Sequence, residues 1–215
     1  MEFVEPAEIE RESMRIIDGE LAARGVALPG DVRPVVRRVI HTTADFDYAE
    51  SLRFTPDAIR RALAALRGAV IVTDTNMALA GINKAALRAL GGEARCYMAE
   101  PFVAEAARAR GVTRAAVSMD HAAEQFPGAV FAVGNAPTAL LRLAAHIERG
   151  MRPALVIGVP VGFVNVAESK ERALAACERC GVPAIVALGR KGGSNVAAAV
   201  CNALLYAALT ERAGP

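Results

Sequence analysis

The sequence contains no tryptophan, and phenylalanine and tyrosine together supply an aromatic content of only 5%. Basic residues are not gathered into runs either, and the formal net charge is only +2. Proteins that follow a nucleic-acid backbone usually combine stacking aromatics with a continuous basic stripe. The composition therefore argues against nucleic acid as a partner, whereas slight basicity suits a small anionic ligand.

Long hydrophobic runs are also absent, although hydrophobic residues make up 53% of the chain. Much of that fraction is alanine, and no apolar run approaches the roughly 20 residues that a membrane-spanning helix needs. The opening residues MEFVEPAEIERESM carry neither the basic nor the apolar segment of a secretory signal. We therefore expect a cytoplasmic protein with no membrane-embedded part.

Histidine and cysteine, the usual transition-metal ligands, are few, with three histidines and four cysteines. Cys177 and Cys180 have the C-x-x-C spacing of redox pairs and zinc ribbons, but no second pair lies at suitable spacing. They also precede Gly181 at a predicted helix end, whereas a thioredoxin-like pair lies at a helix start. We predict no metal site and interpret the cysteines as packing residues.

Apolar runs alternate with helical patterns along most of the chain. Within the central stretch Val130–Lys170, a strand ending at Val133 is followed by a helix that Pro137 opens and by a second strand from Ala154 to Ile157. Strand, helix and strand in this order form a parallel crossover. Five such strands are predicted, near residues 70, 95, 131, 156 and 186.

This pattern predicts a three-layer α/β/α fold with a five-stranded, mostly parallel, flavodoxin-like sheet. No repeat, low-complexity tract or long linker divides the chain, so residues 1–215 are predicted to form a single domain. Open sheets of this kind bind ligands at the carboxyl ends of their strands. The loops after the strands are therefore the candidate functional segments.

Polar residues fill the loops after the first and third predicted strands. Asp74, Thr75 and Asn76 follow the first strand, and Gly134 and Asn135 follow the third. The backbone N–H groups of the second loop are predicted to be free donors for an anion at the start of the Pro137 helix. The alternative interpretation is ordinary turn chemistry.

The segment GRKGGSN leads from the last predicted strand into the final helix. Gly192 and Gly193 allow close backbone approach, Arg190 or Lys191 adds charge, and Ser194 lies at the helix start. The segment is neither a Walker A motif nor G-x-G-x-x-G, and a plain strand-to-helix turn is the alternative. Further positive charge near helix starts is offered by two residues: Lys84 and Arg114.

His41 is the histidine whose position best suits acid–base chemistry. It closes a predicted helix that begins at Val32, and the acidic segment 45–47 follows it. His121 and His146 fall inside helices among alanines, where packing or surface roles are usual. A histidine at a helix end is also commonly a cap stabilised by the helix dipole, so the residues alone leave both roles open for His41.

Four segments resemble, in the same order, the precorrin-8X methylmutases of the cobalamin pathway: HTTADFDYAESLRF, GNAPTALLRL, VIGVPVGFVNVAESK and GRKGGSNVAAAVCNALL. The resemblance covers nearly the whole chain. It implies an isomerase that moves a methyl group from C-11 to C-12 of a corrinoid precursor, giving hydrogenobyrinate or its cobalt counterpart. It also implies an anionic tetrapyrrole substrate, a homodimer with sites near the subunit interface, and no cofactor, since any cobalt belongs to the substrate.

The resemblance also assigns residue roles. The family's catalytic histidine lies in an Arg-x-x-His pattern that this chain matches as Arg38-Val-Ile-His41. As an imidazolium, His41 would protonate or hydrogen-bond the tetrapyrrole near the migrating methyl group. Ser13 aligns with a serine near the substrate, although a mid-helix serine is ordinarily solvent-facing or bonded to the preceding turn. Ala80 and Lys84 stand where some relatives have histidine and arginine.

Together with the strand-end loops, this gives one predicted set of substrate-binding residues: Ser13, Arg38, Asp74, Thr75, Asn76, Lys84, Arg114, Gly134, Asn135, Lys191, Gly192, Gly193 and Ser194. Two other hypotheses compete with the methylmutase. One is a flavodoxin-like module that binds a phosphorylated nucleotide or flavin at the same edge, against which the scarcity of aromatics argues. The other is a structural subunit, which would leave the polar loops without a purpose.

Overall fold

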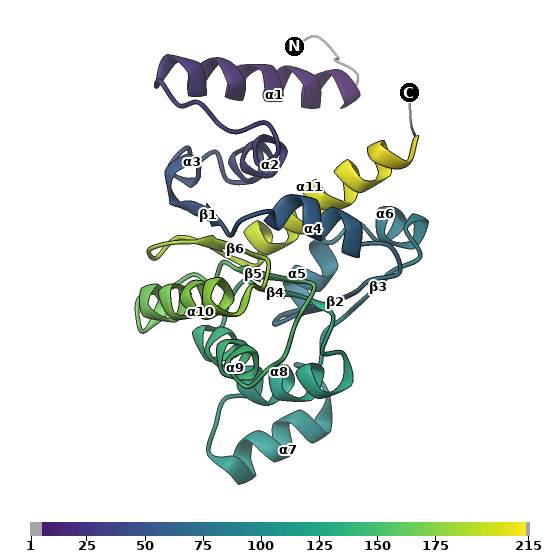
Figure 1. Ribbon diagram of the computed structural model, residues 1–215, viewed down its shortest axis with the longest axis vertical. Helices are drawn as coiled ribbons and strands as arrows, with labels where there is room; N and C mark the ends of the chain where they lie inside the picture. Colours follow the sequence, from purple (N-terminus) through teal and green to yellow (C-terminus); the bar gives the residue numbers. More distant parts are fainter. Residues whose placement is uncertain (1–5, 214–215) are drawn as a thin grey trace.

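The computed structural model describes residues 6–213. Its centre is a six-stranded sheet in the order β1-β6-β5-β4-β2-β3 (Figure 1). The strands from β2 to β6 are parallel, and β1 pairs antiparallel with β6. The strands are β1 (Leu52–Phe54), β2 (Val70–Thr73), β3 (Glu93–Arg95), β4 (Val130–Val133), β5 (Leu155–Gly158) and β6 (Ala184–Ala187).

The five predicted strands are confirmed, but the strand number was wrong because β1 was not predicted. That strand has only three residues, with buried Leu52, exposed Arg53 and half-buried Phe54. Such a short segment shows no clear period in its hydrophobicity. It becomes a strand because its backbone pairs with the edge of β6, where Leu52 lies opposite Ala187.

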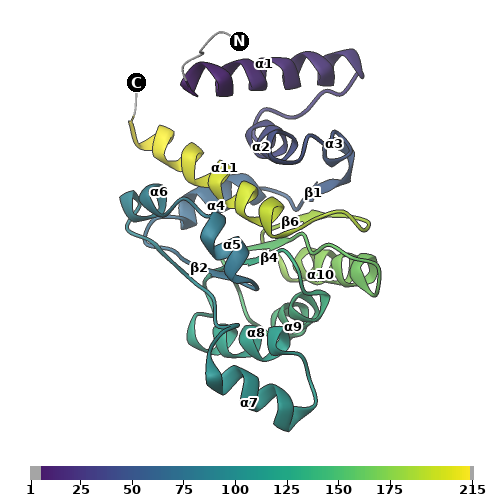
Figure 2. The same ribbon diagram turned by 180° about the vertical axis from the view of Figure 1, so that it is seen from behind.

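Helices cover both faces of the sheet (Figures 1 and 2). On one face lie α2 (Arg33–Thr43), α3 (Tyr48–Ser51), α4 (Ala58–Ala65), α5 (Asn76–Gly81), α6 (Lys84–Ala89) and α11 (Ser194–Ala213), with α1 (Pro6–Ala23) packed on α2. On the other lie α8 (Arg114–Gln125), α9 (Pro137–Glu148) and α10 (Val166–Cys180), with α7 (Pro101–Arg110) packed on α8. The three-layer prediction is confirmed, with α1 and α7 as outlying additions at opposite ends of the molecule.

The central strands are buried on both faces because each face has its own helical cover. In β4, Val130 and Ala132 pack into the core on the α11 side, whereas Phe131 and Val133 pack into the core on the α9 side. Cys177 and Cys201 are buried in these cores, as expected of packing residues, and Cys96 and Cys180 are half-buried. Within residues 6–213, no helix combines the length and apolar character needed to cross a bilayer.

Candidate active site at the carboxyl edge of the sheet

Asp74 ties the loop after β2 to the loop after β4. Its side chain is fully buried, and its carboxylate accepts hydrogen bonds from the backbone N–H groups of Gly134, Asn135 and Ala136 at 2.8, 2.8 and 2.7 Å. Burial raises the pKa of Asp74, and these three donors oppose that rise. The prediction that Gly134 and Asn135 offer free backbone donors was therefore wrong, because an internal carboxylate already uses them.

The same two loops contact the start of α11. The hydroxyl oxygens of Thr75 and Ser194 are 2.8 Å apart, and the Thr75 hydroxyl also caps α5 by accepting from Ala78 N–H. Gly134 lies directly against this helix start, since a Cβ on it would stand 2.7 Å from Ser194 Cα and 2.8 Å from Gly193 O. Three of the predicted segments, including those of Asp74 and Ser194, thus form one connected edge.

The loop after β6 is bound to the loop after β5. Gly193 N–H donates to Val159 O at 2.9 Å, and Gly162 N–H donates to Arg190 O at 3.2 Å. Gly192 must be glycine here, because a Cβ would collide with the carbonyl oxygen of Val159. The predicted close approach of the GRKGGSN backbone is therefore present, although its immediate neighbour is another loop of the protein.

Lys191 joins the segment after His41 to this edge. Its Nζ lies 2.7 Å from Asp45 Oδ2 and 2.6 Å from Asp47 Oδ2. The hydrogen bond from Lys191 lowers the pKa of Asp45, and the two carboxylates raise the pKa of Lys191. His41 itself is exposed in the last turn of α2, four residues before Asp45.

Arg38 and Ser13 lie in contacts between α1, α2 and α11. The Arg38 guanidinium is 2.5 Å from Glu10 Oε1 and 5.2 Å from the centre of the Tyr206 ring. The Ser13 hydroxyl donates to Ile9 O at 2.8 Å, one turn earlier, which is the ordinary behaviour of a mid-helix serine. A cavity of about 430 Å³ lies beside Arg38 and Tyr206.

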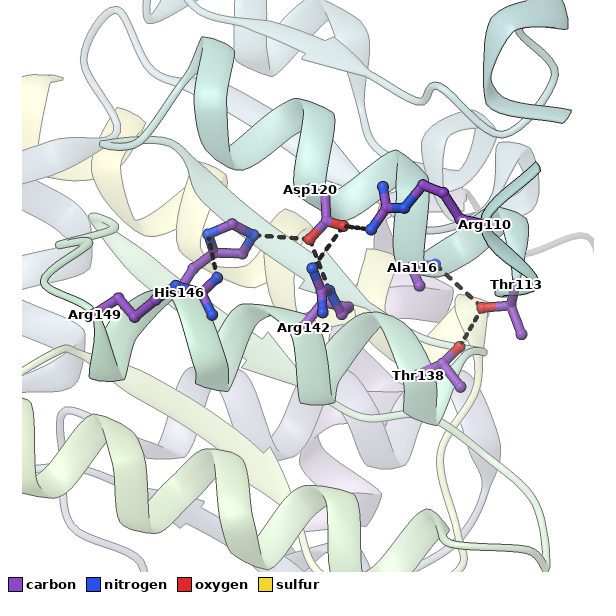
Figure 3. A network of polar contacts seen from close by, with 8 residues as sticks. All are labelled: Arg110, Thr113, Ala116, Asp120, Thr138, Arg142, His146 and Arg149. Atoms are coloured by element: carbon purple, nitrogen blue, oxygen red, sulfur yellow. Dashed lines mark hydrogen bonds and ion pairs between the residues drawn. The ribbon is translucent and has the colours of Figure 1, made fainter. Parts of the chain in front are cut away.

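Arg114 lies at the carboxyl edge, whereas Lys84 is engaged elsewhere. Thr113 caps α8, and its hydroxyl is 2.7 Å from that of Thr138 in the first turn of α9 (Figure 3). This contact holds the start of α8, with exposed Arg114, beside the Asn135 loop. Lys84 Nζ donates instead to Leu79 O and Ile82 O, and burial lowers its pKa. Asn76 is exposed at the start of α5.

Lys170 is the residue of this edge that sequence reasoning missed. It lies in α10, its side chain is fully buried, and its Nζ donates to Gly189 O at 2.9 Å and Lys191 O at 2.7 Å. A pattern in the sequence signals this position, because Lys170 follows Val166 by four residues and precedes Ala173 by three. Both of those neighbours are buried, so helical spacing places Lys170 on the inward face.

The edge combines exposed cations with exposed apolar side chains. Arg190 stacks 5.6 Å from the ring centre of Phe163, and Phe163 and Val164 are 83% and 77% exposed in the loop after β5. Such a surface suits a ligand with an apolar body and anionic arms. Across residues 6–213, His, Cys, Asp and Glu form no group that could hold a metal ion.

Comparison with known proteins identifies the family of the chain. The family model for precorrin-8X methylmutase matches residues 8–207. A cobalt-precorrin-8 methylmutase of Salmonella typhimurium is 52% identical over 174 residues, covering 80% of each chain. A precorrin-8X methylmutase of Pseudomonas aeruginosa is 40% identical, covering 91% of this chain and 93% of its own.

Solved structures agree as well. The crystal structure of a precorrin-8X methylmutase from Thermus thermophilus superimposes with a TM-score of 0.83 at 44% identity, covering 94% of this chain and 98% of that one. The family model spans residues 8–207, which include each loop of the carboxyl edge, and the structural match covers 94% of the chain. The chain belongs to the precorrin-8X methylmutase family.

Proposed function

We propose that this protein catalyses the intramolecular migration of a methyl group from C-11 to C-12 of precorrin-8X or cobalt-precorrin-8 in cobalamin biosynthesis. The family match over residues 8–207 is the observation that carries the proposal. It also favours the methylmutase over a module that binds a nucleotide or flavin. Relatives named for the cobalt-containing and for the metal-free substrate both match at about the same coverage, so both substrates belong in the test.

His41 is the proposed acid. Its exposed position in the last turn of α2 leaves the imidazole accessible, and the two ion pairs of Lys191 hold the following segment at the carboxyl edge. An imidazolium that protonates or hydrogen-bonds the macrocycle beside the migrating methyl group would stabilise the charge that develops during the shift. The methyl group moves within one molecule, so no methyl donor is required.

The edge loops are proposed to hold the substrate's carboxylates. Asn135, Arg114 and Arg190 are exposed there, and the first turn of α11 begins at Ser194 with backbone N–H groups of the kind that bind anions. Holding several carboxylates at once would fix the macrocycle in one orientation relative to His41. We further propose that the protein is a cytoplasmic homodimer and that it needs no cofactor of its own.

Replacing His41 by asparagine tests the catalytic proposal. Purified His41→Asn protein should lose about 10²- to 10⁴-fold in turnover of precorrin-8X, the usual contribution of a general acid. It should still bind hydrogenobyrinate, because the carboxylate contacts are elsewhere. Turnover and binding are both followed through the absorption spectrum of the corrinoid.

His121→Asn is the matched control. His121 is the α8 histidine that packs against the rings of Tyr97 and Phe102, at centroid distances of 4.7 and 4.8 Å. This variant should keep wild-type turnover once its folding has been verified. Near-normal turnover by the His41 variant would remove His41 from the proposed role, and inactivity of the wild-type protein toward both substrates would refute the function itself.

A further inference from the structure

Lys170 is a buried cation that the proposed chemistry does not use. Its side chain has no exposed surface, and no carboxylate within residues 6–213 forms an ion pair with it. Its partners are two backbone carbonyls of one loop, Gly189 O and Lys191 O. Burying an ammonium group is costly, so its place beneath this loop calls for an explanation.

The two hydrogen bonds set the direction of two peptide groups. In a planar trans peptide the N–H points opposite to the C=O. Because the carbonyls of Gly189 and Lys191 point toward Lys170, the N–H groups of Arg190 and Gly192 point away from it. Arg190 is exposed and Gly192 is half-buried, while Lys170 is fully buried, so these N–H groups are directed away from the core, on the outer side of the loop.

The same loop is held from its other side by Lys191. The carbonyl of Lys191 accepts from Lys170 on the inner side of the loop. The side chain of Lys191 reaches outward to Asp45 and Asp47, in the segment after His41. The position of the loop backbone therefore determines the direction of the outward N–H groups. It also determines where Lys191 holds the segment after His41. One buried ammonium group acts on both parts of the proposed site.

We propose that Lys170 is a positioning residue for the methylmutase reaction: it turns the 189–192 backbone so that its amides face the substrate's carboxylates and its Lys191 side chain holds the His41 segment. The inference rests on the proposed function. Burial lowers the pKa of Lys170 to about 8, so the side chain is mainly protonated at neutral pH and can serve both carbonyls as a charged donor.

Limited trypsin digestion measures the loop without any substrate. The bonds after Arg190 and Lys191 are trypsin sites held by the contacts with Lys170. Lys170→Met keeps the length of the side chain and removes its charge and donors, so cleavage at these two bonds should be at least about tenfold faster, given the strength of charged hydrogen bonds. Mass spectrometry of the fragments identifies the bonds cut.

Arg152→Met is the matched control. Arg152 also donates to two backbone carbonyls, those of Ile147 and Met151, at 3.1 and 2.8 Å. It precedes β5 and so lies at the opposite, amino-terminal edge of the sheet. Its replacement should leave cleavage at 190 and 191, and the kinetic constants, unchanged.

Steady-state kinetics with precorrin-8X and titration with hydrogenobyrinate supply the functional readout. Contacts to peripheral carboxylates bind substrate and transition state alike, so their loss raises KM more than it lowers kcat. Lys170→Met should raise KM and the product Kd about tenfold, with a smaller change in kcat. A global structural defect would instead lower the active fraction and leave KM unchanged.

The outcomes separate the two proposals. Wild-type protein that converts neither precorrin-8X nor cobalt-precorrin-8 would refute the proposed function, while the trypsin result still decides whether Lys170 sets the loop. Wild-type cleavage rates and KM in Lys170→Met would overturn the inference. Should that variant not fold, Lys170→Gln, which keeps N–H donors, takes its place with smaller effects expected. Unfolding of both variants would make Lys170 a residue of global stability and also overturn the inference.

Discussion

Asp120 is a heavily paired carboxylate outside the proposed site (Figure 3). Its oxygens accept from Arg142 at 2.7 and 2.8 Å, from Arg110 at 2.7 Å and from His146 at 2.8 Å. Its side chain is only 9% exposed. These contacts join the end of α7, the middle of α8 and the middle and last turn of α9 through a single residue.

The pKa of Asp120 makes this network testable through pH. Burial alone would raise that pKa, but the hydrogen bonds from Arg142, Arg110 and His146 outweigh it and lower it from 3.8 to about 2. A carboxylate with a lowered folded-state pKa stabilises the fold above its unfolded-state value. The contribution, on the order of 2 kcal/mol, is lost as the pH falls from about 4 through 2.

Asp120→Asn should therefore lower the free energy of unfolding at pH 7 by about 2 to 3 kcal/mol, because it leaves the surrounding cations without a counterion. The variant should also lose less stability than wild type between pH 4 and 2. Urea unfolding across that range measures both effects. Glu148→Gln, which breaks only more exposed pairs with Arg172 and Arg179, should cost less than about 1 kcal/mol, and an equal cost in both variants would contradict the assignment.

Residue roles were less predictable from sequence than residue positions. Asp74 was expected to face the ligand because it follows a strand. It does follow β2 directly, at the carboxyl edge of the sheet. Its carboxylate nevertheless points inward, since three backbone N–H groups of the neighbouring loop need an acceptor. Only the tertiary pairing of β2 with β4 creates that need, so no local pattern could reveal it.

The chain directly after β4 approaches the start of α11 closely at the carboxyl edge. Gly134, at the end of β4, has no room for a side chain because its neighbours are backbone atoms of Gly193 and Ser194. Backbone atoms cannot move aside as a side-chain tip can. The start of α11 therefore stays in place only while position 134 is glycine.

Gly134→Ala should thus destabilise the protein by about 1 to 3 kcal/mol, the usual cost of overpacking. Gly128, which precedes β4 at its other end, has no atom within 4 Å of an added Cβ. Gly128→Ala should change stability by no more than about 0.5 kcal/mol. Thermal unfolding of the two variants compares the two ends of one strand. Equal losses of stability would mean that the close approach at Gly134 does not contribute to the cost of the substitution.

Helices of several turns were predictable from the sequence, whereas the brief helices α3 and α5 were not. The helix predicted to begin at Val32, the helix predicted to open at Pro137 and the helix end predicted before Gly181 match α2, α9 and α10 to within a residue or two, because each helix has several turns and a clear start or stop. The brief helices α3 and α5 were missed, since four and six residues show less than two turns of periodicity. α5 was instead interpreted as part of a polar loop.

At the scale of the whole molecule, the two hydrophobic cores lie on opposite faces of one sheet and extend to different distances from it. The core on the α11 side extends outward through α2 to α1, and the core on the α9 side is followed by the small cluster between α7 and α8. The molecule is therefore elongated across the sheet, with α1 and α7 at its ends (Figures 1 and 2). Its organisation as one domain over residues 1–215 stays a prediction.

The homodimer is a prediction at this same scale. Sedimentation equilibrium of the purified protein should give twice the chain mass of 22.5 kDa, and the value should persist at the protein concentrations used for turnover. Because the proposed site is expected near the subunit interface, dilution into the monomer range should lower specific activity. A concentration-independent monomer with full activity would contradict the dimer.

The reversed direction of β1 has a consequence for how the active edge is assembled. In a uniformly parallel sheet, only segments that come after a strand arrive at the ligand-binding side. Since β1 runs against β6, the chain reaches that side before entering the strand, and it delivers α2 and α3 there. The proposed catalytic histidine, His41, thus comes from the polypeptide upstream of the first strand, and a three-residue edge pairing decides which part of the chain would meet the proposed substrate.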